Sequence, residues 1–206
     1  ITSVFAARED EIPVERWSEL VRNAESECHI LVIALSGWAK DRRTWDAIGE
    51  CLRRKVQVNI LFLNPESDAA KVRAREETWW NTSQRTTWAM DKFWRFRKGL
   101  SSDEEREKLY LGTYDSTPSC AIVWSNGKMI VAHYIVSVDN RYSPGWILQD
   151  VGLIRNLLGR LGIRSEKRPL FDVYEEDFKA ILDKSEELTE ERIQQYKKKW
   201  RGKAHE

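Results

Sequence analysis

The sequence predicts an α/β fold in which a mixed, mostly parallel sheet is flanked by helices and followed by a C-terminal helical segment. Two short apolar runs, His29–Ser36 and Val56–Leu63, enclose a helical pattern over Asp41–Arg54. An Asn-Gly pair between two later apolar runs is the strongest short-range signal of a β-hairpin. We therefore expect a single domain over residues 1–206, with a core at about 3–160 and a helical extension at about 161–206.

The first elements follow from local spacing. Ser3–Ala6 is a short predicted edge strand, and Pro13 suits the first turn of a helix. That helix repeats its apolar residues every three to four positions, at Trp17, Leu20, Val21 and Ala24. The two apolar runs lack polar alternation, as strands buried on both faces do. Strand, helix and strand in this order predict a parallel, right-handed unit.

The later elements are predicted in the same way. Helical periodicity continues from Ser67 to about Gly99, and Ser101–Lys108 is a polar helical turn. The remaining strands are predicted at Leu109–Tyr114, Ser119–Trp124 and Met129–Val136. Asn126-Gly127 joins the last two of them, because both residues accept a positive φ. Helices are predicted at Trp146–Leu161 and, as one or two pieces, from Pro169 to about Arg201.

The composition limits the classes of partner that the protein is expected to bind. Charged residues make up 33% of the 206 and hydrophobic residues 41%, which is an ordinary globular balance. A net charge of +1 provides no global field that favours nucleic acid or an acidic membrane. The longest purely apolar run, Ile30–Leu35, is far shorter than the roughly 20 residues that cross a bilayer. No secretion signal opens the chain. We expect a cytoplasmic protein without a membrane partner.

Cysteine and histidine usage argues against a metal site. Cys28, Cys51 and Cys120 are odd in number and widely spaced, which is typical of reduced thiols packed in a core. The three histidines show no ligand spacing, and we expect no metal and no cofactor. The sequence also lacks a nucleophile elbow, a Walker loop and a dinucleotide fingerprint.

Three stretches carry a resemblance to a known superfamily. AESECHILVIALSGWAKDRRTWDAIGECLRRKVQVNILFLNPES, from Ala24 to Ser67, is similar to the opening βαβ unit of phospholipase D-like domains. SCAIVWSNGKMIVAH, from Ser119 to His133, occupies the place of their catalytic hairpin. With VFAAREDEIPVERWSELVRNA at the start, residues 3–160 also resemble bacterial phospholipase D-like domains that follow helix-turn-helix regulators. This resemblance implies a sensor or regulatory module more than an enzyme.

The resemblance also implies where catalysis would occur. The superfamily's hairpin carries a His nucleophile, a Lys two residues on that binds phosphate oxygens, and an Asp five further that orients the His. If Asn126 matches that Asp, Ser119 takes the His position and Ala121 the Lys position. The serine lacks a base, and the alanine cannot neutralise phosphate. The sequence therefore predicts a degenerate, pseudoenzyme site with no catalytic residue.

The preferred interpretation of the hairpin and its surroundings is a ligand-binding pocket without catalytic activity. Open α/β sheets bind ligands at the carboxyl ends of their strands. The candidate lining consists of Ser36, Trp38, Tyr114, Ser119, His133 and Tyr134. The alternative is that they are ordinary loop and core residues, and His133 in particular lies in an apolar run. The ligand would be an unknown small molecule or a protein partner.

The ten tryptophans are unusual, and six of them fall between Trp38 and Trp94. In the segment 73–98, aromatic side chains alternate with arginines and lysines, a mixture that can bind single-stranded nucleic acid. The same spacing also fits a helix packed on a sheet or a homodimer contact, and acidic residues dilute the charge. Three hypotheses follow: a non-catalytic regulatory domain, a phosphodiesterase or nuclease with a non-standard nucleophile, and, less favoured, a nucleic-acid-binding module.

Overall fold

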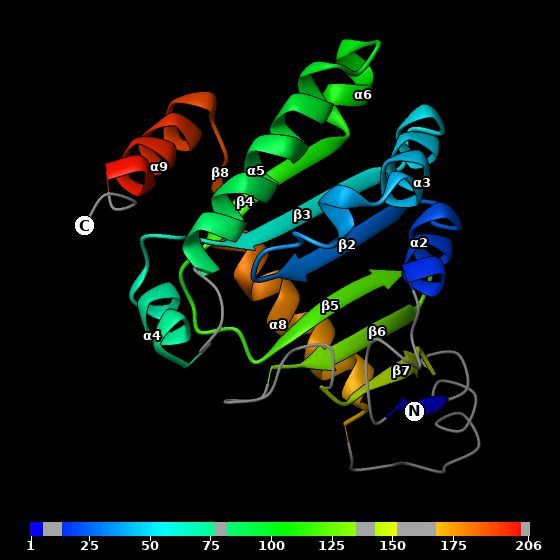
Figure 1. Cartoon of the computed structure of the whole chain (residues 1–206). Helices are drawn as coiled ribbons and strands as arrows, with labels where there is room; N and C mark the ends of the chain where they lie inside the picture. The colour runs from blue at the N-terminus through cyan, green and yellow to red at the C-terminus, as the bar shows by residue number, and fades with distance from the viewer. Residues whose placement is uncertain (6–13, 77–81, 135–142, 152–167, 203–206) are drawn as a thin grey trace, which may run out of the picture.

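An eight-stranded sheet lies between two layers of helices (Figure 1). The computed structural model describes residues 1–5, 14–76, 82–134, 143–151 and 168–202. The strands are β1 (Ser3–Phe5), β2 (Glu27–Val32), β3 (Gln57–Leu63), β4 (Leu109–Tyr114), β5 (Cys120–Ser125), β6 (Lys128–His133), β7 (Gly145–Gln149) and β8 (Glu186–Glu187). The helices are α2 (Val14–Arg22), the 3-10 turn η1 (Trp38–Lys40), α3 (Arg42–Arg53), α4 (Asp68–Glu76), α5 (Thr82–Lys98), α6 (Asp103–Glu107), α8 (Leu170–Asp183) and α9 (Glu190–Gly202).

The strand order is β1-β7-β6-β5-β2-β3-β4-β8. This arrangement confirms the predicted α/β class, a mixed sheet flanked by helices. Parallel pairing is confined to β2, β3 and β4, and every other neighbouring pair is antiparallel. The sheet thus contains fewer parallel strand pairs than predicted. One of the antiparallel pairs, β5 with β6, follows from the hairpin, since a two-residue turn joins strands only in antiparallel pairing.

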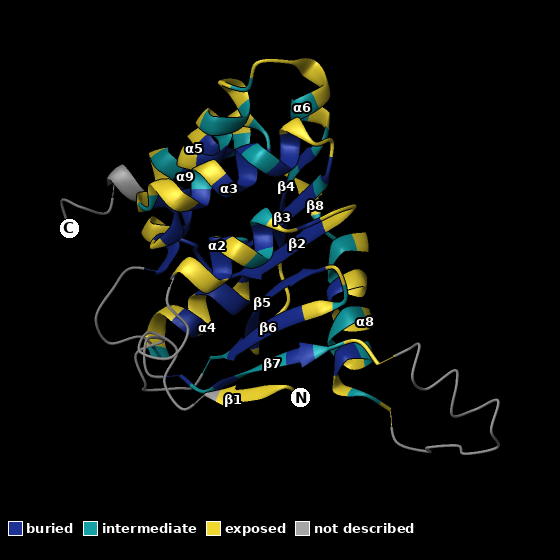
Figure 2. Cartoon of the chain, turned by 90° about the vertical axis from the view of Figure 1, so that its right-hand side faces the viewer, coloured by how far each residue is buried: buried dark blue, intermediate teal, exposed yellow. Residues whose placement is uncertain are grey.

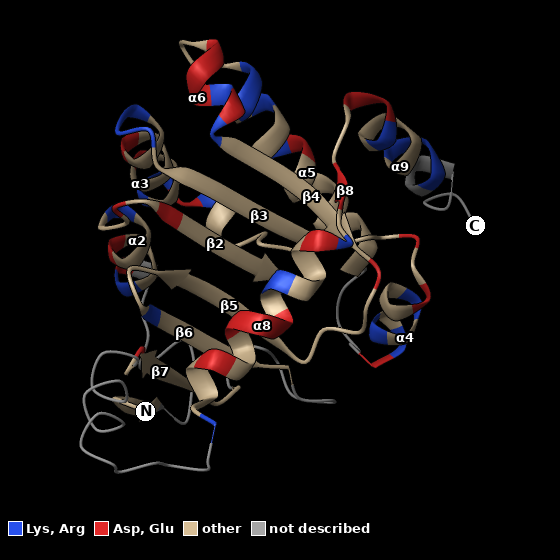
Figure 3. Cartoon of the chain, turned by 180° about the vertical axis from the view of Figure 1, so that it is seen from behind, with Lys and Arg blue, Asp and Glu red and all other residues tan. Residues whose placement is uncertain are grey.

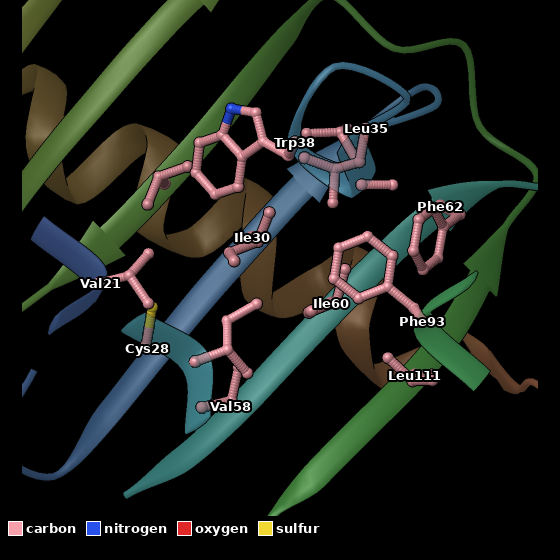
Figure 4. Packing of buried hydrophobic residues seen from close by; sticks show 14 of the residues in the cluster. Val21, Cys28, Ile30, Leu35, Trp38, Val58, Ile60, Phe62, Phe93 and Leu111 are labelled. Carbon is pink, nitrogen blue, oxygen red and sulfur yellow. The ribbon is translucent and has the colours of Figure 1, made fainter. Parts of the chain in front are cut away.

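The two central strands are buried on both faces, as their apolar runs predicted. In β2, Cys28 and Ile30 point to the layer of α2, α3 and α5, whereas His29 and Leu31 point to the opposite layer. Figure 4 shows the first layer, where Phe93 of α5 packs on the sheet residues. Alternation by two residues places every second side chain on the same face of the sheet.

Helices cover the two faces in distinct groups. Buried residues of α2, α3 and α5 share one hydrophobic cluster with the sheet, and α8 contributes Phe171 and Phe178 to the other (Figure 2). The helix α3 begins after Asp41, whose side chain accepts a hydrogen bond from Arg43 N, as an N-cap residue does.

We call residues 184–202 the C-terminal strap. It leaves α8 on one face, pairs β8 with β4 at the edge of the sheet, and continues as α9 against α5 on the other face (Figure 1). Leu188 and Ile193 are almost completely buried in the cluster of α2, α3 and α5. The predicted helix from Pro169 is thus two helices with a short strand between them.

The predicted hairpin is confirmed. Asn126 and Gly127 have φ values of 48° and 67°, and they join β5 to β6 with Ser125 opposite Lys128. Two successive residues with positive φ give a turn whose twist matches that of the flanking strands.

The helix predicted at Trp146–Leu161 is wrong in its first part. Residues 145–149 form β7, which pairs with β6 on one side and with β1 on the other. The run Trp146-Ile147-Leu148 is too short for its periodicity to distinguish a strand from a helix. Backbone pairing with β6 makes the segment a strand. The rest of that prediction, from residue 152, lies outside the described residues, as do Trp79 and Trp80.

Candidate functional site

The strands β2, β3, β4 and β6 all end at one edge of the sheet, where β5 begins. We call this the carboxyl edge. It is the edge at which the sequence predicted a pocket, and the loops that follow β2 and β3 lead there into η1 and α4.

Three hydroxyl groups hold the last peptides of β2. Tyr114 Oη donates to the carbonyl oxygen of Val32 at 3.1 Å, and Tyr134 Oη accepts from Ile33 N at 3.1 Å. Thr86 Oγ1 of α5 lies 3.3 Å from Ile33 O and 2.9 Å from Thr82 O of its own helix, so its one hydroxyl hydrogen is placed between two carbonyl oxygens. The register between β2 and β5 ends at Leu31, so these side chains satisfy buried backbone groups beyond that point. Burial also raises the pKa of Tyr114, which keeps its hydroxyl protonated as a donor.

Ser36 lies just after this peptide and meets an arginine of α5. Arg85 directs both Nε and Nη2 at the Oγ of Ser36, at 3.1 and 2.8 Å. Ser36 is buried, whereas Arg85 is exposed. Two parallel N–H groups of a guanidinium match two oxygens of a carboxylate or phosphate, yet here they converge on one hydroxyl oxygen.

A second guanidinium lies at the same edge. Arg73 of α4 is 4% exposed and stacks over the ring of Tyr134, with its Cζ 5.3 Å from the ring centroid. Its Nη1 pairs with Glu76 at 3.0 Å. Because Tyr134 also holds Ile33, the two arginines approach the end of β2 from two different helices.

Other predicted site residues divide between this edge and the rest of the molecule. Ser119 is at the carboxyl edge, where its carbonyl oxygen accepts from Tyr134 N, and its side chain is exposed. Trp38 is 5% exposed and packs edge-on against Trp17 at 5.7 Å between ring centroids, so its ring belongs to the core.

The three degenerate positions are not brought together. Ala121 is buried within β5, and Asn126 is at the opposite edge of the sheet from Ser119. There its side chain accepts from Glu25 N and donates to Asn23 O. The six residues of β5 separate Asn126 from Ser119 by about 20 Å of strand. Asn126 fastens the turn to the loop before β2, and a cleft shared by Ser119 and Asn126 is excluded.

His133 points toward α8. Its Nε2 is 3.3 Å from Tyr174 Oη, and Trp146 Nε1 donates to the same hydroxyl at 3.4 Å. The imidazole also packs edge-on against Trp146 at 4.6 Å between centroids. Partial burial lowers the pKa of His133 below its usual value.

A buried polar row lies under α8, away from the carboxyl edge. His29 Nδ1 is 3.1 Å from Asn59 Nδ2, and its Nε2 is 3.1 Å from a carboxylate oxygen of Glu27. The ring stacks on Trp124 at 4.4 Å. Burial lowers the pKa of His29, and the neighbouring Glu27 opposes part of that effect.

Two hollows in the described part of the molecule lie away from the carboxyl edge. One of about 510 Å³ is near the beginnings of β3 and β4 and is lined by Gln57, Asn59, Arg97, Glu107, Leu109, Tyr110, Leu182 and Glu187. Another of about 390 Å³ lies between α5 and α9. Within the described ranges, no group of His, Cys, Asp or Glu side chains could hold a metal ion. None of the helices described is both long and apolar enough to cross a membrane.

Sequence reasoning did not single out Arg73 and Arg85 as residues of this edge. Both were part of the basic and aromatic segment, and nothing in their spacing shows that they meet the end of β2. Their position depends on how α4 and α5 fold back over the sheet.

Solved structures place this architecture among phospholipase D-like folds. The chain is similar to Nuc, a phospholipase D family member from Salmonella typhimurium (TM-score 0.52, 8% identity, 90% of this chain and 97% of that one). It is also similar to phosphatidylserine synthase of Haemophilus influenzae Rd KW20 (TM-score 0.55, 14% identity, 98% and 45%). A third similar structure is TrmBL2, an archaeal chromatin protein that binds DNA (TM-score 0.51, 13% identity, 90% and 52%). The chain spans about half the length of the latter two proteins. At these identities the likeness shows the fold alone.

The family is shown by the sequence itself. Residues 47–189, more than half of the chain, match the model of the family described as Domain of unknown function (DUF5919), and the chain belongs to it. No sequence among curated proteins matches the chain.

Proposed function

We propose that this phospholipase D-like domain is a non-catalytic regulatory module that binds a small ligand through an oxyanion group at the carboxyl edge. The observation that carries the proposal is the pair of N–H groups that Arg85 directs at Ser36. A phosphate or carboxylate in place of the single hydroxyl oxygen would give each N–H group its own acceptor. Arg73, which is paired with Glu76, places a second guanidinium at the same edge, where Ala121 contributes no charge.

The surroundings of Ser119 support a binding site without catalytic activity. The Oγ of Ser119 donates to Cys120 Sγ at 3.7 Å. Burial raises the pKa of Cys120 to about 11, so this thiol stays protonated near neutral pH and cannot act as a base. His133, the nearest histidine along the hairpin, is turned toward Tyr174. A serine nucleophile requires an adjacent general base.

Calorimetric titration tests the proposal. The probes are inorganic phosphate, a nucleoside monophosphate and a sugar phosphate, each added to the whole chain. We expect at least one to bind, and Arg85→Gln to weaken its binding about 10- to 100-fold, since hydrogen bonds to charged groups contribute about 1.5–3 kcal/mol. Arg85→Lys keeps the charge without the fork and should lose an intermediate amount.

A matched control separates the site from general charge. Arg53→Gln removes the same charge from an exposed position at the far end of α3, and it should leave the dissociation constant unchanged. Absence of binding by all three probes, or equal losses in the Arg85 and Arg53 variants, would contradict the proposal.

The competing hypothesis is a phosphodiesterase that uses Ser119 as its nucleophile. Hydrolysis of bis-p-nitrophenyl phosphate by the purified chain measures this directly. We expect no turnover above the buffer rate. Turnover that Ser119→Ala abolishes would make the protein an enzyme and overturn the non-catalytic assignment.

A further inference from the structure

The outward face of α5 carries an exposed aromatic ring among cations. Trp88, Lys92 and Arg95 follow one another at three- and four-residue spacing, and all three side chains are exposed. Lys40 of η1 reaches the same ring from the neighbouring loop. We call these four residues the α5 ridge. From Trp88 to Arg95 it extends for about 10 Å along the helix.

Trp88 differs from the other tryptophans. It is 37% exposed, whereas Trp17, Trp38 and Trp124 are 2–6% exposed. Among tryptophans whose burial the structure describes, Trp88 is the one in the exposed class. Large aromatic rings on a surface are typical of binding sites, because their burial against a partner is favourable.

The cations of the α5 ridge surround that ring. Lys92 Nζ is 5.5 Å and Lys40 Nζ is 5.8 Å from its centroid. Within the part of the chain that the structure describes, neither ammonium group pairs with a carboxylate. Arg95 is 69% exposed and pairs with Asp91 at 3.1 Å, a carboxylate that Lys197 of α9 also contacts. Further lysines lie along α9 (Figure 3), including the exposed Lys198.

Several other basic and aromatic residues of segment 73–98 are held in contacts within the molecule instead. Phe93 is completely buried, and Arg97 is bound to Glu187 at 2.9 Å while its guanidinium covers Trp94. Arg73 and Arg85 belong to the carboxyl edge. Packing therefore leaves the α5 ridge as an exposed aromatic face beside two ammonium groups, those of Lys40 and Lys92, that pair with no carboxylate among the described residues.

We propose that the α5 ridge binds single-stranded nucleic acid. An unpaired base would stack on Trp88, and its flanking phosphates would meet Lys40, Lys92 and Arg95. A duplex keeps its bases stacked on one another and offers none to an indole on a convex helix face. This inference is independent of the proposed ligand site, since the α5 ridge shares no residue with it.

Fluorescence anisotropy with labelled dT12 tests the proposal at low salt. We expect dT12 to bind more tightly than a 12-base-pair duplex. Trp88→Ala should weaken dT12 binding about 5- to 100-fold, and Trp88→Phe, which keeps a stacking face, should lose less. Each of Lys40→Gln and Lys92→Gln should make the slope of log affinity against log salt shallower by about 0.7.

Two controls make the outcome decisive. Ser36→Ala alters the proposed oxyanion site and should leave dT12 binding unchanged, as should Arg53→Gln. Circular dichroism establishes that each variant is folded. Absence of dT12 binding, a Trp88→Ala variant that binds as tightly as the original chain, or equal affinity for a polyglutamate peptide would overturn the inference.

Discussion

Asn126 supports the β5–β6 turn in two separable ways. Its backbone adopts a φ of 48°, and its side chain bonds to Asn23 O and Glu25 N in the loop before β2. Alanine disfavours the left-handed region and offers no side-chain partner, whereas glycine accepts the φ and lacks only the partner.

We predict that Asn126→Ala lowers the free energy of unfolding by about 1–3 kcal/mol, the sum of backbone strain and lost hydrogen bonds. Asn126→Gly should lose less, and the difference between the two variants measures the strain. Urea denaturation gives both values. Equal destabilisation by alanine and glycine would show that φ does not matter at this turn.

Single residues also show how far the sequence predicts the site. Ser36, Tyr114, Ser119 and Tyr134 were expected at the carboxyl edge from strand ends alone, and they lie there. Strand ends are visible locally because turn residues follow apolar runs. The two arginines and the distant position of Asn126 were not predicted, because each depends on which elements pack together across the sheet.

At the level of elements, some strands are determined by their local sequence and others by tertiary pairing. The strands β2 to β6 were predicted correctly because their runs are long or bounded by a hairpin turn. The strand β7 was mistaken for a helix, because its apolar run of three residues gains its conformation from pairing with β6. The sequence left open whether one or two helices follow Pro169, since the apolar stripe of α8 and α9 continues through β8.

The element whose contribution is easiest to isolate is α9. We predict that Ile193→Ala, at a side chain only 1% exposed, lowers the free energy of unfolding by about 2–5 kcal/mol. Gln194→Ala at the exposed neighbouring position should change it by less than about 0.5 kcal/mol. Thermal or urea denaturation measures both. Similar small losses in the two variants would mean that α9 does not stabilise the sheet.

At the scale of the whole molecule, the buried His29 and the half-buried His133 link unfolding to pH. Burial lowers the pKa of His29 and of His133, while the unfolded chain returns each to about 6.5. Below that value the unfolded state therefore binds more protons, and stability falls as the pH falls. Glu27 and Glu175 oppose this effect at His29, and Lys179 adds to it.

We predict that the free energy of unfolding decreases between pH 6.5 and pH 5, with a contribution from His29 of at most about 1.4 kcal/mol per pH unit. His29→Gln should make the dependence shallower, although it lowers stability at pH 8 by disturbing the contact with Asn59. Urea denaturation across this range provides the slopes. An unchanged slope in the variant, or stability that rises toward pH 5, would refute the prediction.

The two ends of the sheet have a consequence for self-association. A long, bare outermost strand can recruit strands from other molecules and start an aggregate. Here β1 has three residues and β8 has two, and both residues of β8 are glutamates. A neighbouring chain that adds to β8 would meet two glutamates already paired with Arg97 and Arg192, and almost no backbone to pair with. We therefore expect the short β8 to disfavour fibril-like growth at this end of the sheet, while the rest of the C-terminal strap packs α9 against α5.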